Sequence, residues 1–295
     1  MLVLAACTQS KRGVVAPRRR LRQYTLDGDA SVVAKSWAAA LRGPVAGTSP
    51  LTHLYKGGYW SAAVELLRSL PGAELAVVSA GLGLVPATAV HGPYSATFSS
   101  GHPDSVPGAS DSAGRAKWWG LLGASERLRA KVRQASRVFV VLPNRYLDVV
   151  ADDLLASDRG HVQVFASACP RPLAAALGRR LFQVKAPMIR QLGTNVSALA
   201  PKAATFVLEG GRAENAELRR RFEQLEVEDE AALYPVRKKQ TPQEVAEWLR
   251  SALATAEPPT SATAALRAFR ASGRAFEQKR FHRLFREVVM DERTS

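Results

Sequence analysis

Five short, continuous apolar runs alternate with segments of helical pattern along this chain, and they constrain its fold more than any other feature. Because these runs are continuous and do not alternate between apolar and polar residues, they are typical of strands covered on both faces of a sheet. They lie at residues 2–6, 75–79, 137–142, 162–166 and 205–208, and helical spacing predicts helices over residues 59–70, 117–134, 143–157, 172–182 and 213–225. Strands alternating with helices predict an α/β fold with three layers and a mostly parallel central sheet.

The chain changes character near residue 235. We therefore expect an α/β domain over residues 1–235 and a helical, basic C-terminal extension over residues 236–295. Thr241 to Glu244 is a typical helix start. A linker rich in Pro, Thr and Ser follows at 257–263, and one last helix is expected from about residue 264 to 289.

Two polar turns identify a candidate site in the N-terminal half. One turn follows the first apolar run and ends at Lys11, and the other begins at Ser79 after the second run. Because parallel strands deliver their carboxyl ends to one edge of a sheet, we expect Lys11, Ser79 and Tyr94 to lie close together, with Asn144 on the rim. The segment 86–115 follows the second turn and is rich in Gly, Pro, Ser and His. Its length favours a functional loop over a disordered one.

The charge balance indicates a polyanionic partner. The chain has 41 Lys and Arg against 26 Asp and Glu, a formal net charge of +15. Such an excess is expected of a protein that binds nucleic acid, and double-stranded DNA is the partner we predict. The alternative is an arginine-rich protein whose basic faces are only solvated. The residues expected to contact the DNA backbone are Arg18, Arg19, Arg20, Arg22, Lys279, Arg280 and Arg283.

The remaining composition argues against several other classes. Cys7 and Cys169 are the only cysteines, and the five histidines show no metal-ligand spacing, so we expect neither a disulfide framework nor a metal. No cofactor is expected. A monomer in the reducing cytoplasm is the simplest expectation. No apolar run approaches the length of a membrane span, so a membrane partner is not expected.

Several motifs together resemble a bacterial family of small α/β proteins, and the resemblance covers about residues 1–155. That family is similar to peroxide-stress DNA-binding proteins and to the glycosylase-like domains of archaeosine synthesis and deazaguanine modification. More narrowly, the motifs resemble anti-phage DNA glycosylases that remove glucosylated hydroxymethylcytosine. The motifs are the segments 7–11 and 78–84, the Leu54-Tyr55-x-Gly57 and Pro93-Tyr94 motifs, and Asn144-Arg145-Tyr146.

The resemblance implies a sheet like that of uracil-DNA glycosylase and a hydrolase that flips a modified base out of DNA. Such an enzyme cleaves the N-glycosidic bond and leaves an abasic site, here in antiviral defence. A non-enzymatic DNA-binding stress protein of the same fold is the alternative, and a base-exchanging transferase is a third reading. The substrate-binding residues would be Thr8, Ser10, Lys11, Tyr55, Ser79, Gly81, Gly83, Tyr94, Asn144 and Tyr146.

Glycosidic cleavage also needs a group that stabilises positive charge on the sugar. The family often has a charged residue after its Pro-Tyr pair, and this chain has Ser95 there. We therefore assign the catalytic carboxylate to Asp104 or Asp111, with Asp104 preferred, although Asp104 also suits a plain turn. Lys11 is expected to hold a phosphate or a sugar, in preference to acting as a Schiff-base nucleophile. Asn144 suits a helix cap as well as a contact to a base edge.

Overall fold

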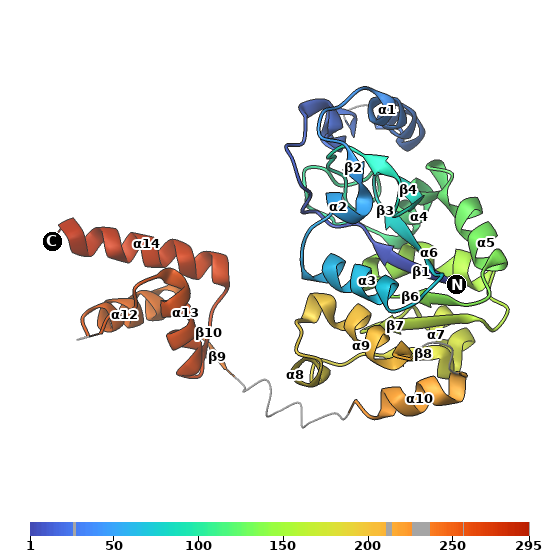
Figure 1. Cartoon of the computed structure of the whole chain (residues 1–295). Coiled ribbons are helices and arrows are strands. Elements are labelled where there is room, and N and C mark those ends of the chain that lie inside the picture. Colours follow the sequence, from blue (N-terminus) through green and yellow to red (C-terminus); the bar gives the residue numbers. More distant parts are fainter. Residues whose placement is uncertain (26–27, 211–213, 226–236, 256, 295) are drawn as a thin grey trace. The chain divides into compact units, whose positions relative to one another are not determined.

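The computed structural model describes residues 1–25, 28–210, 214–225, 237–255 and 257–294. The chain divides into two compact units, residues 1–227 and 228–295 (Figure 1). The boundary expected after residue 235 lies outside the described residues. Each unit has a hydrophobic core of its own.

Unit 1 is built on a six-stranded sheet with the order β4-β3-β1-β6-β7-β8. Only β4 runs antiparallel, against β3, and the other neighbours are parallel. The expected α/β class with a mostly parallel sheet is therefore confirmed. The strands are β1 (Leu2–Ala6), β3 (Glu74–Ser79), β4 (Gly83–Pro86), β6 (Val138–Val140), β7 (Val162–Ala166) and β8 (Leu181–Gln183).

Strand β1 lies in the middle of the sheet, and all five of its residues are buried. Its Leu4 pairs with Ala76 of β3 on one side and with Val140 of β6 on the other. The strands that follow β1 in sequence, β3 and β4, lie on one side of it, and the later strands β6, β7 and β8 lie on the other side. This is the arrangement at which ligands bind in open α/β sheets, beyond the carboxyl ends of the strands.

Helices pack against the sheet in two groups (Figure 1). The helices α3 (Gly58–Arg68) and α9 (Leu199–Leu208) contact each other, and α3 contacts β1 and β3 while α9 contacts β7. The second group, in mutual contact, is α4 (Ser112–Leu121), α5 (Ala124–Gln134), α6 (Asn144–Leu155) and α7 (Arg171–Leu177).

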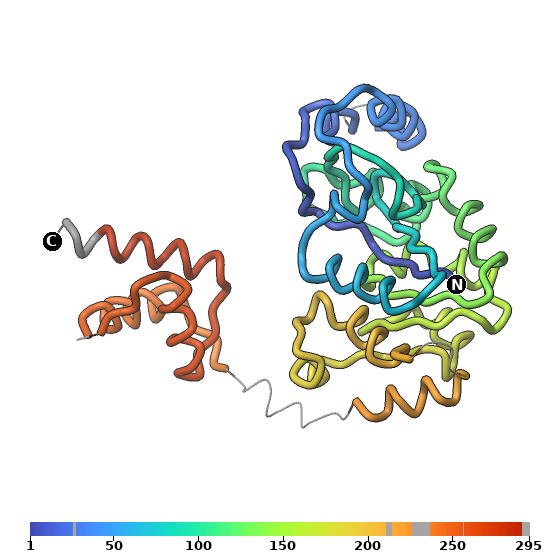
Figure 2. The backbone as a smooth tube through the Cα atoms, in the orientation of Figure 1, coloured from blue at the N-terminus to red at the C-terminus, as the bar shows by residue number. Residues whose placement is uncertain are grey.

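Smaller elements complete unit 1, and Figure 2 follows the chain through them. The helix α1 (Ala30–Arg42) was not expected from the sequence, and Asp29 caps its start. The others are η1 (Pro17–Arg19), η2 (Leu21–Gln23), β2 (Ser49–Pro50), α2 (Leu51–Leu54), β5 (Val90–His91), η4 (Gly178–Arg180), α8 (Met188–Gln191), η5 (Val196–Ala198) and α10 (Asn215–Glu223).

Three predictions about unit 1 were wrong. The run 205–208 is not a strand but the end of α9, because a short apolar run suits a buried helix as well as a buried strand. The last strand of the sheet is instead β8, which lies at the end of the expected helix 172–182. The helix there, α7, stops at Gly178, whose φ is +50°. In the same way, Gly123 at φ +63° divides the expected helix 117–134 into α4 and α5.

Within its described residues, 237–255 and 257–294, unit 2 has three helices and two short parallel strands. Helix α12 (Pro242–Leu253) begins with the expected capping box, in which Thr241 and Glu244 bond each other's backbone N–H. The expected last helix is divided at Gly273 into α13 (Ala262–Ala271) and α14 (Gln278–Thr294). Between them β10 (Arg274–Ala275) pairs with β9 (Lys238–Lys239). In the part of the chain that the structure describes, no helix combines the length and the apolar character needed to span a membrane.

Candidate functional site

The carboxyl ends of β1 and β3 meet around a buried lysine. Lys11, Tyr55, Ser79 and Tyr94 lie together here, and we call them the lysine–tyrosine cluster. The amine of Lys11 is 4.3 Å from the centre of the Tyr94 ring and 5.5 Å from that of Tyr55. All four residues are at most 9% exposed. The expected proximity of Lys11, Ser79 and Tyr94 is therefore confirmed, and the position of Asn144 on the rim of this cluster stays a prediction.

Three hydroxyl groups of the cluster form a hydrogen-bonded chain. The Tyr94 hydroxyl lies 2.5 Å from that of Tyr55 and 2.6 Å from Ser79 Oγ. Ser79 Oγ also accepts the backbone N–H groups of Gly81 at 3.2 Å and Leu82 at 3.1 Å. Because these two bonds occupy the lone pairs of Ser79, its own O–H is directed to Tyr94. The turn after β3 thus fixes the position of the Tyr94 hydroxyl.

Lys11 is a buried amine with little compensation. Its Nζ donates to the carbonyl oxygen of Thr8 at 2.8 Å. Among the described residues, no carboxylate forms an ion pair with it. Burial lowers the pKa of Lys11, partly opposed by the nearby Cys7. Burial likewise raises the pKa values of Tyr55 and Tyr94 well above the ordinary tyrosine value, so both phenols are neutral hydrogen-bond donors at neutral pH.

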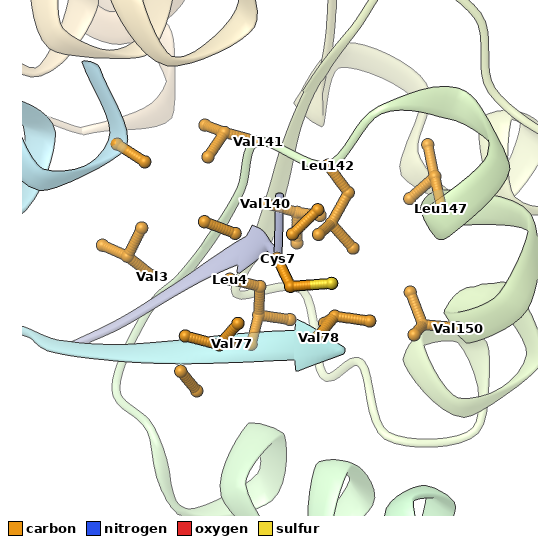
Figure 3. Close-up of a cluster of buried hydrophobic side chains, with 14 of the residues drawn as sticks. Val3, Leu4, Cys7, Val77, Val78, Val140, Val141, Leu142, Leu147 and Val150 are labelled. Carbon is orange, nitrogen blue, oxygen red and sulfur yellow. The ribbon is translucent and has the colours of Figure 1, made fainter. Parts of the chain in front are cut away.

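Two further tyrosines connect β1 to β6 and α6. The Tyr59 hydroxyl accepts the N–H of Ala6 at 2.7 Å and donates to the carbonyl of Val141 at 3.1 Å. The Tyr146 hydroxyl lies 3.3 Å from Cys7 Sγ. Figure 3 shows Cys7 at the end of β1 among apolar side chains, with its sulfur pointing toward α6. Burial raises the pKa values of both tyrosines, so their hydroxyls are neutral.

A cavity of about 440 Å³ opens at the carboxyl ends of β6, β7 and β8, and we call it the β6–β8 pocket. Its size and its predominantly apolar walls are typical of small-molecule sites. Tyr59 connects it to the end of β1. The other lining residues are Val141, Leu142, Pro143, Asn144, Ala166, Ser167, Val184, Ala186, Val196, Ser197, Leu199 and Ala200.

Asn144 supplies a polar group of defined orientation to this pocket. Its Oδ1 accepts the backbone N–H of Ala168 and the hydroxyl of Ser167, each at 3.2 Å. A backbone N–H can only donate, so the side-chain oxygen must face Ala168 and the amide nitrogen must point away from it. Nδ2 has no hydrogen-bond acceptor among residues 1–25, 28–210, 214–225, 237–255 and 257–294. Asn144 therefore offers two free N–H donors at the pocket.

Asp104, the preferred catalytic carboxylate, has a local role in the structure. Its Oδ1 accepts from Arg22 Nε at 2.8 Å, and its Oδ2 accepts from Arg22 Nη2 at 2.9 Å and from Ser95 Oγ at 2.6 Å. Burial alone would raise the pKa of Asp104, but the hydrogen bonds from Arg22 and Ser95 outweigh it and lower the pKa to about 2. The backbone of Ser95 is also paired with Arg19 and Leu21. Asp104 thus holds the residue that follows Tyr94.

The other expected site residues also have local explanations. Asp111 is exposed and caps α4 by accepting the N–H of Gly114 at 2.7 Å. A Cβ atom at Gly81 would lie 2.5 Å from Tyr94 Cε2, so this glycine makes room for the tyrosine ring. Gly83 has φ +69°, which favours glycine. The Thr8 hydroxyl donates to the carbonyl of Ser10 at 2.8 Å, outside the lysine–tyrosine cluster.

The basic residues expected to contact DNA fall into two groups. Arg19 is 2% exposed and donates to the carbonyls of Leu41 and Gly43, and Arg22 is held by Asp104. Arg18 is exposed and donates to the carbonyl of Pro44, and Arg20 is half-buried, so contact of these two with a phosphate stays a prediction. Lys279, Arg280 and Arg283 are all exposed on α14.

The structure also supplies residues that the sequence did not single out, chiefly Tyr59, Ser167 and Ser197 around the β6–β8 pocket. Ser167 directly follows β7, and this position could have indicated it, whereas Tyr59 lies in α3 and Ser197 in η5, where no local signal marks them. Over the described ranges, no group of three His, Cys, Asp or Glu side chains is arranged to hold a metal ion. Comparison of the chain with protein-family models, with curated proteins and with solved structures found no match.

Proposed function

We propose that this chain is a DNA glycosylase that hydrolyses the N-glycosidic bond of a modified base, such as glucosylated hydroxymethylcytosine in phage DNA. The observation that carries the proposal is the β6–β8 pocket, in which Asn144 presents free N–H donors beyond the carboxyl ends of three parallel strands. The motif resemblance and the +15 charge support the same reading. We infer that the enzyme acts in the cytoplasm as a monomer.

In this proposal the target nucleotide is rotated out of the duplex and its base enters the pocket. A volume of about 440 Å³ exceeds what a plain pyrimidine fills, so it favours a base with a bulky substituent. The apolar walls, including Leu142 and Leu199, enclose the ring, and the amide of Asn144 donates to an exocyclic oxygen. Basic side chains on α14 bind phosphates along the backbone.

The test is release of the base from defined DNA. Duplexes that contain glucosylated hydroxymethylcytosine, hydroxymethylcytosine or plain cytosine are incubated with the full chain. Free base is measured by mass spectrometry and abasic sites by cleavage with alkali. The proposal expects release from the glucosylated duplex first. Absence of release from all three duplexes, by folded protein that binds them, would overturn it.

Asn144→Asp sharpens the test. The aspartate can still accept the N–H of Ala168 and the hydroxyl of Ser167, so the start of α6 is retained, but the free donors are lost. Base release should fall by about 10-fold or more, as for a lost hydrogen bond of 1.4 kcal/mol or more to substrate. Gln243→Glu makes the same exchange at an exposed amide on α12 and should leave release unchanged.

A second function, non-enzymatic DNA binding in a stress response, is favoured by one observation. Asp104 is bonded by Arg22 and Ser95, and Asp111 caps a helix, so neither expected carboxylate is free to face a sugar. A chain that binds DNA with a steep salt dependence and releases no base or sugar would support this alternative.

A further inference from the structure

We infer that Lys11 is a nucleophile that forms a Schiff base with C1′ of an abasic deoxyribose and so gives the chain a strand-cleaving lyase activity. The inference rests on the proposed function for its biological setting, because base release would supply the abasic site. It deepens that function by naming the reacting group.

The first argument is the position of the Lys11 amine. A lysine side chain is almost never this buried unless it is paired, and Lys11 is 9% exposed. Its Nζ makes one hydrogen bond, to the carbonyl of Thr8, although an ammonium group has three donors. Within the described residues no carboxylate compensates its charge. Desolvation therefore disfavours the ammonium form, which increases the fraction of neutral, nucleophilic amine at neutral pH.

The second argument is what surrounds the amine. The rings of Tyr94 and Tyr55 flank it, and their hydroxyls form a chain with Ser79. Imine formation requires a proton for the departing hydroxyl of the carbinolamine. Neutral phenols held in a fixed chain can donate a hydrogen bond to this hydroxyl, while the proton itself comes from water, since burial raises the pKa of both phenols and disfavours their ionisation.

The third argument is access. Lys11 lies at the end of the turn after β1, and Gln9 and Ser10 of this turn are exposed. The carbonyl that holds the amine belongs to Thr8 in this same turn. We expect a sugar to approach the amine from the side of this turn and to displace this one bond. The turn also lies at the edge of the sheet where the β6–β8 pocket opens.

The chemistry balances without a further reactant. The neutral amine adds to the C1′ aldehyde of the open sugar, and the carbinolamine loses water to give a protonated imine. A proton then leaves C2′, and the bond between C3′ and its phosphate oxygen breaks with the phosphate as leaving group. Water finally hydrolyses the unsaturated imine, which restores the amine of Lys11 and releases the aldehyde.

The experiment uses the full chain and a duplex with one preformed abasic site, together with sodium cyanoborohydride, which reduces an imine to a stable amine. We expect a covalent protein–DNA adduct whose peptide map places the DNA on Lys11. Without the reductant, the strand should be cut on the 3′ side of the abasic site. No adduct, or an adduct spread over exposed lysines, would overturn the inference.

Two variants control for folding and for nonspecific reaction. Lys11→Met keeps the length of the side chain without the amine and should reduce the adduct to background. Lys56→Met removes an exposed lysine next to Tyr55 and should leave the adduct unchanged. If Lys11→Met does not fold, the peptide map of the parental adduct still decides the question.

The abasic site is preformed, so this test does not depend on base release. An adduct at Lys11 without release from any modified duplex would support the lyase and contradict the glycosylase. Base release without an adduct would support the glycosylase and contradict the role of Lys11.

Discussion

Asp104 and Arg22 form a two-point ion pair in which the carboxylate side chain is 1% exposed and the guanidinium is 39% exposed. The pair joins η2, in which Arg22 lies, to the long loop 86–115. Ser95, the neighbour of Tyr94, donates to the same carboxylate. The pair therefore fixes one wall of the lysine–tyrosine cluster, although it does not touch Lys11.

Replacing Asp104 by Asn should destabilise unit 1 by about 2–3 kcal/mol, because the buried carboxylate accepts hydrogen bonds from both Arg22 and Ser95 and a neutral amide cannot accept all of them. The measurement is the free energy of unfolding in urea. Asp111→Asn removes an exposed carboxylate from the same loop and should cost about 1 kcal/mol or less, as expected for a changed helix cap. Equal losses in the two variants would contradict the structural role of Asp104.

The stability of the chain should depend on pH through Asp104. Its folded-state pKa of about 2 lies below the unfolded value of 3.8, so its contribution is complete above about pH 4 and is lost as the pH falls through 2. The difference in unfolding free energy between the parental chain and Asp104→Asn should therefore shrink between pH 5 and pH 2. Urea titrations at several pH values check this. A difference that is constant over the range would count against it.

Tyr94→Phe should destabilise the chain by about 1–3 kcal/mol, since the hydroxyls of Ser79 and Tyr55 lose their shared partner in the core. The ring itself remains, so the contact between Lys11 and the aromatic face is retained. Tyr24→Phe is the matched control, because its hydroxyl donates to the carbonyl of Arg18 at an exposed position. It should cost well under the loss at Tyr94 in the same denaturation measurement.

The basic residues should separate into DNA-binding and structural groups. Replacing Lys279 and Arg283 of α14 together by Gln should make the plot of log affinity against log salt shallower. The magnitude of its negative slope should fall by about 2, close to one for each lost phosphate contact. Arg19→Gln should leave that slope unchanged and lower stability instead, because its guanidinium donates to two backbone carbonyls. Filter binding at several salt concentrations, with thermal unfolding alongside, distinguishes these outcomes.

The secondary structure could be predicted wherever the pattern of apolar residues in a segment fitted only a strand or only a helix. The runs that form β1 and β7 are apolar except for Gln163, and all of their residues, Gln163 included, are buried. The pattern failed at 205–208, because this short run, Thr-Phe-Val-Leu, suits a buried helix as well as a strand. It also failed to divide helices at Gly123 and Gly273, since the sequence does not show that these two glycines adopt a positive φ while Gly120 continues α4.

The location of the candidate site could be predicted from the sequence, but the roles of its side chains could not. Strand polarity alone brings the turns after β1 and β3 together, so the proximity of Lys11 to Tyr94 followed from the order of the elements. The role of Asp104 did not, because its partner Arg22 lies 82 positions away in the sequence and nothing local pairs them. The β6–β8 pocket likewise depends on packing between α9 and the sheet, which no short motif encodes.

The close approach of Gly81 to Tyr94 has a consequence for how this chain can vary. A Cβ atom at position 81 would meet ring atoms of Tyr94 at 2.5 and 2.8 Å, so any side chain there displaces the ring. Position 81 can accept alanine only if position 94 gives up its aromatic ring, and the hydroxyl chain with it. Substitutions at these two positions should therefore be correlated. We expect a residue larger than glycine at position 81 only in related chains that have a smaller residue than tyrosine at position 94.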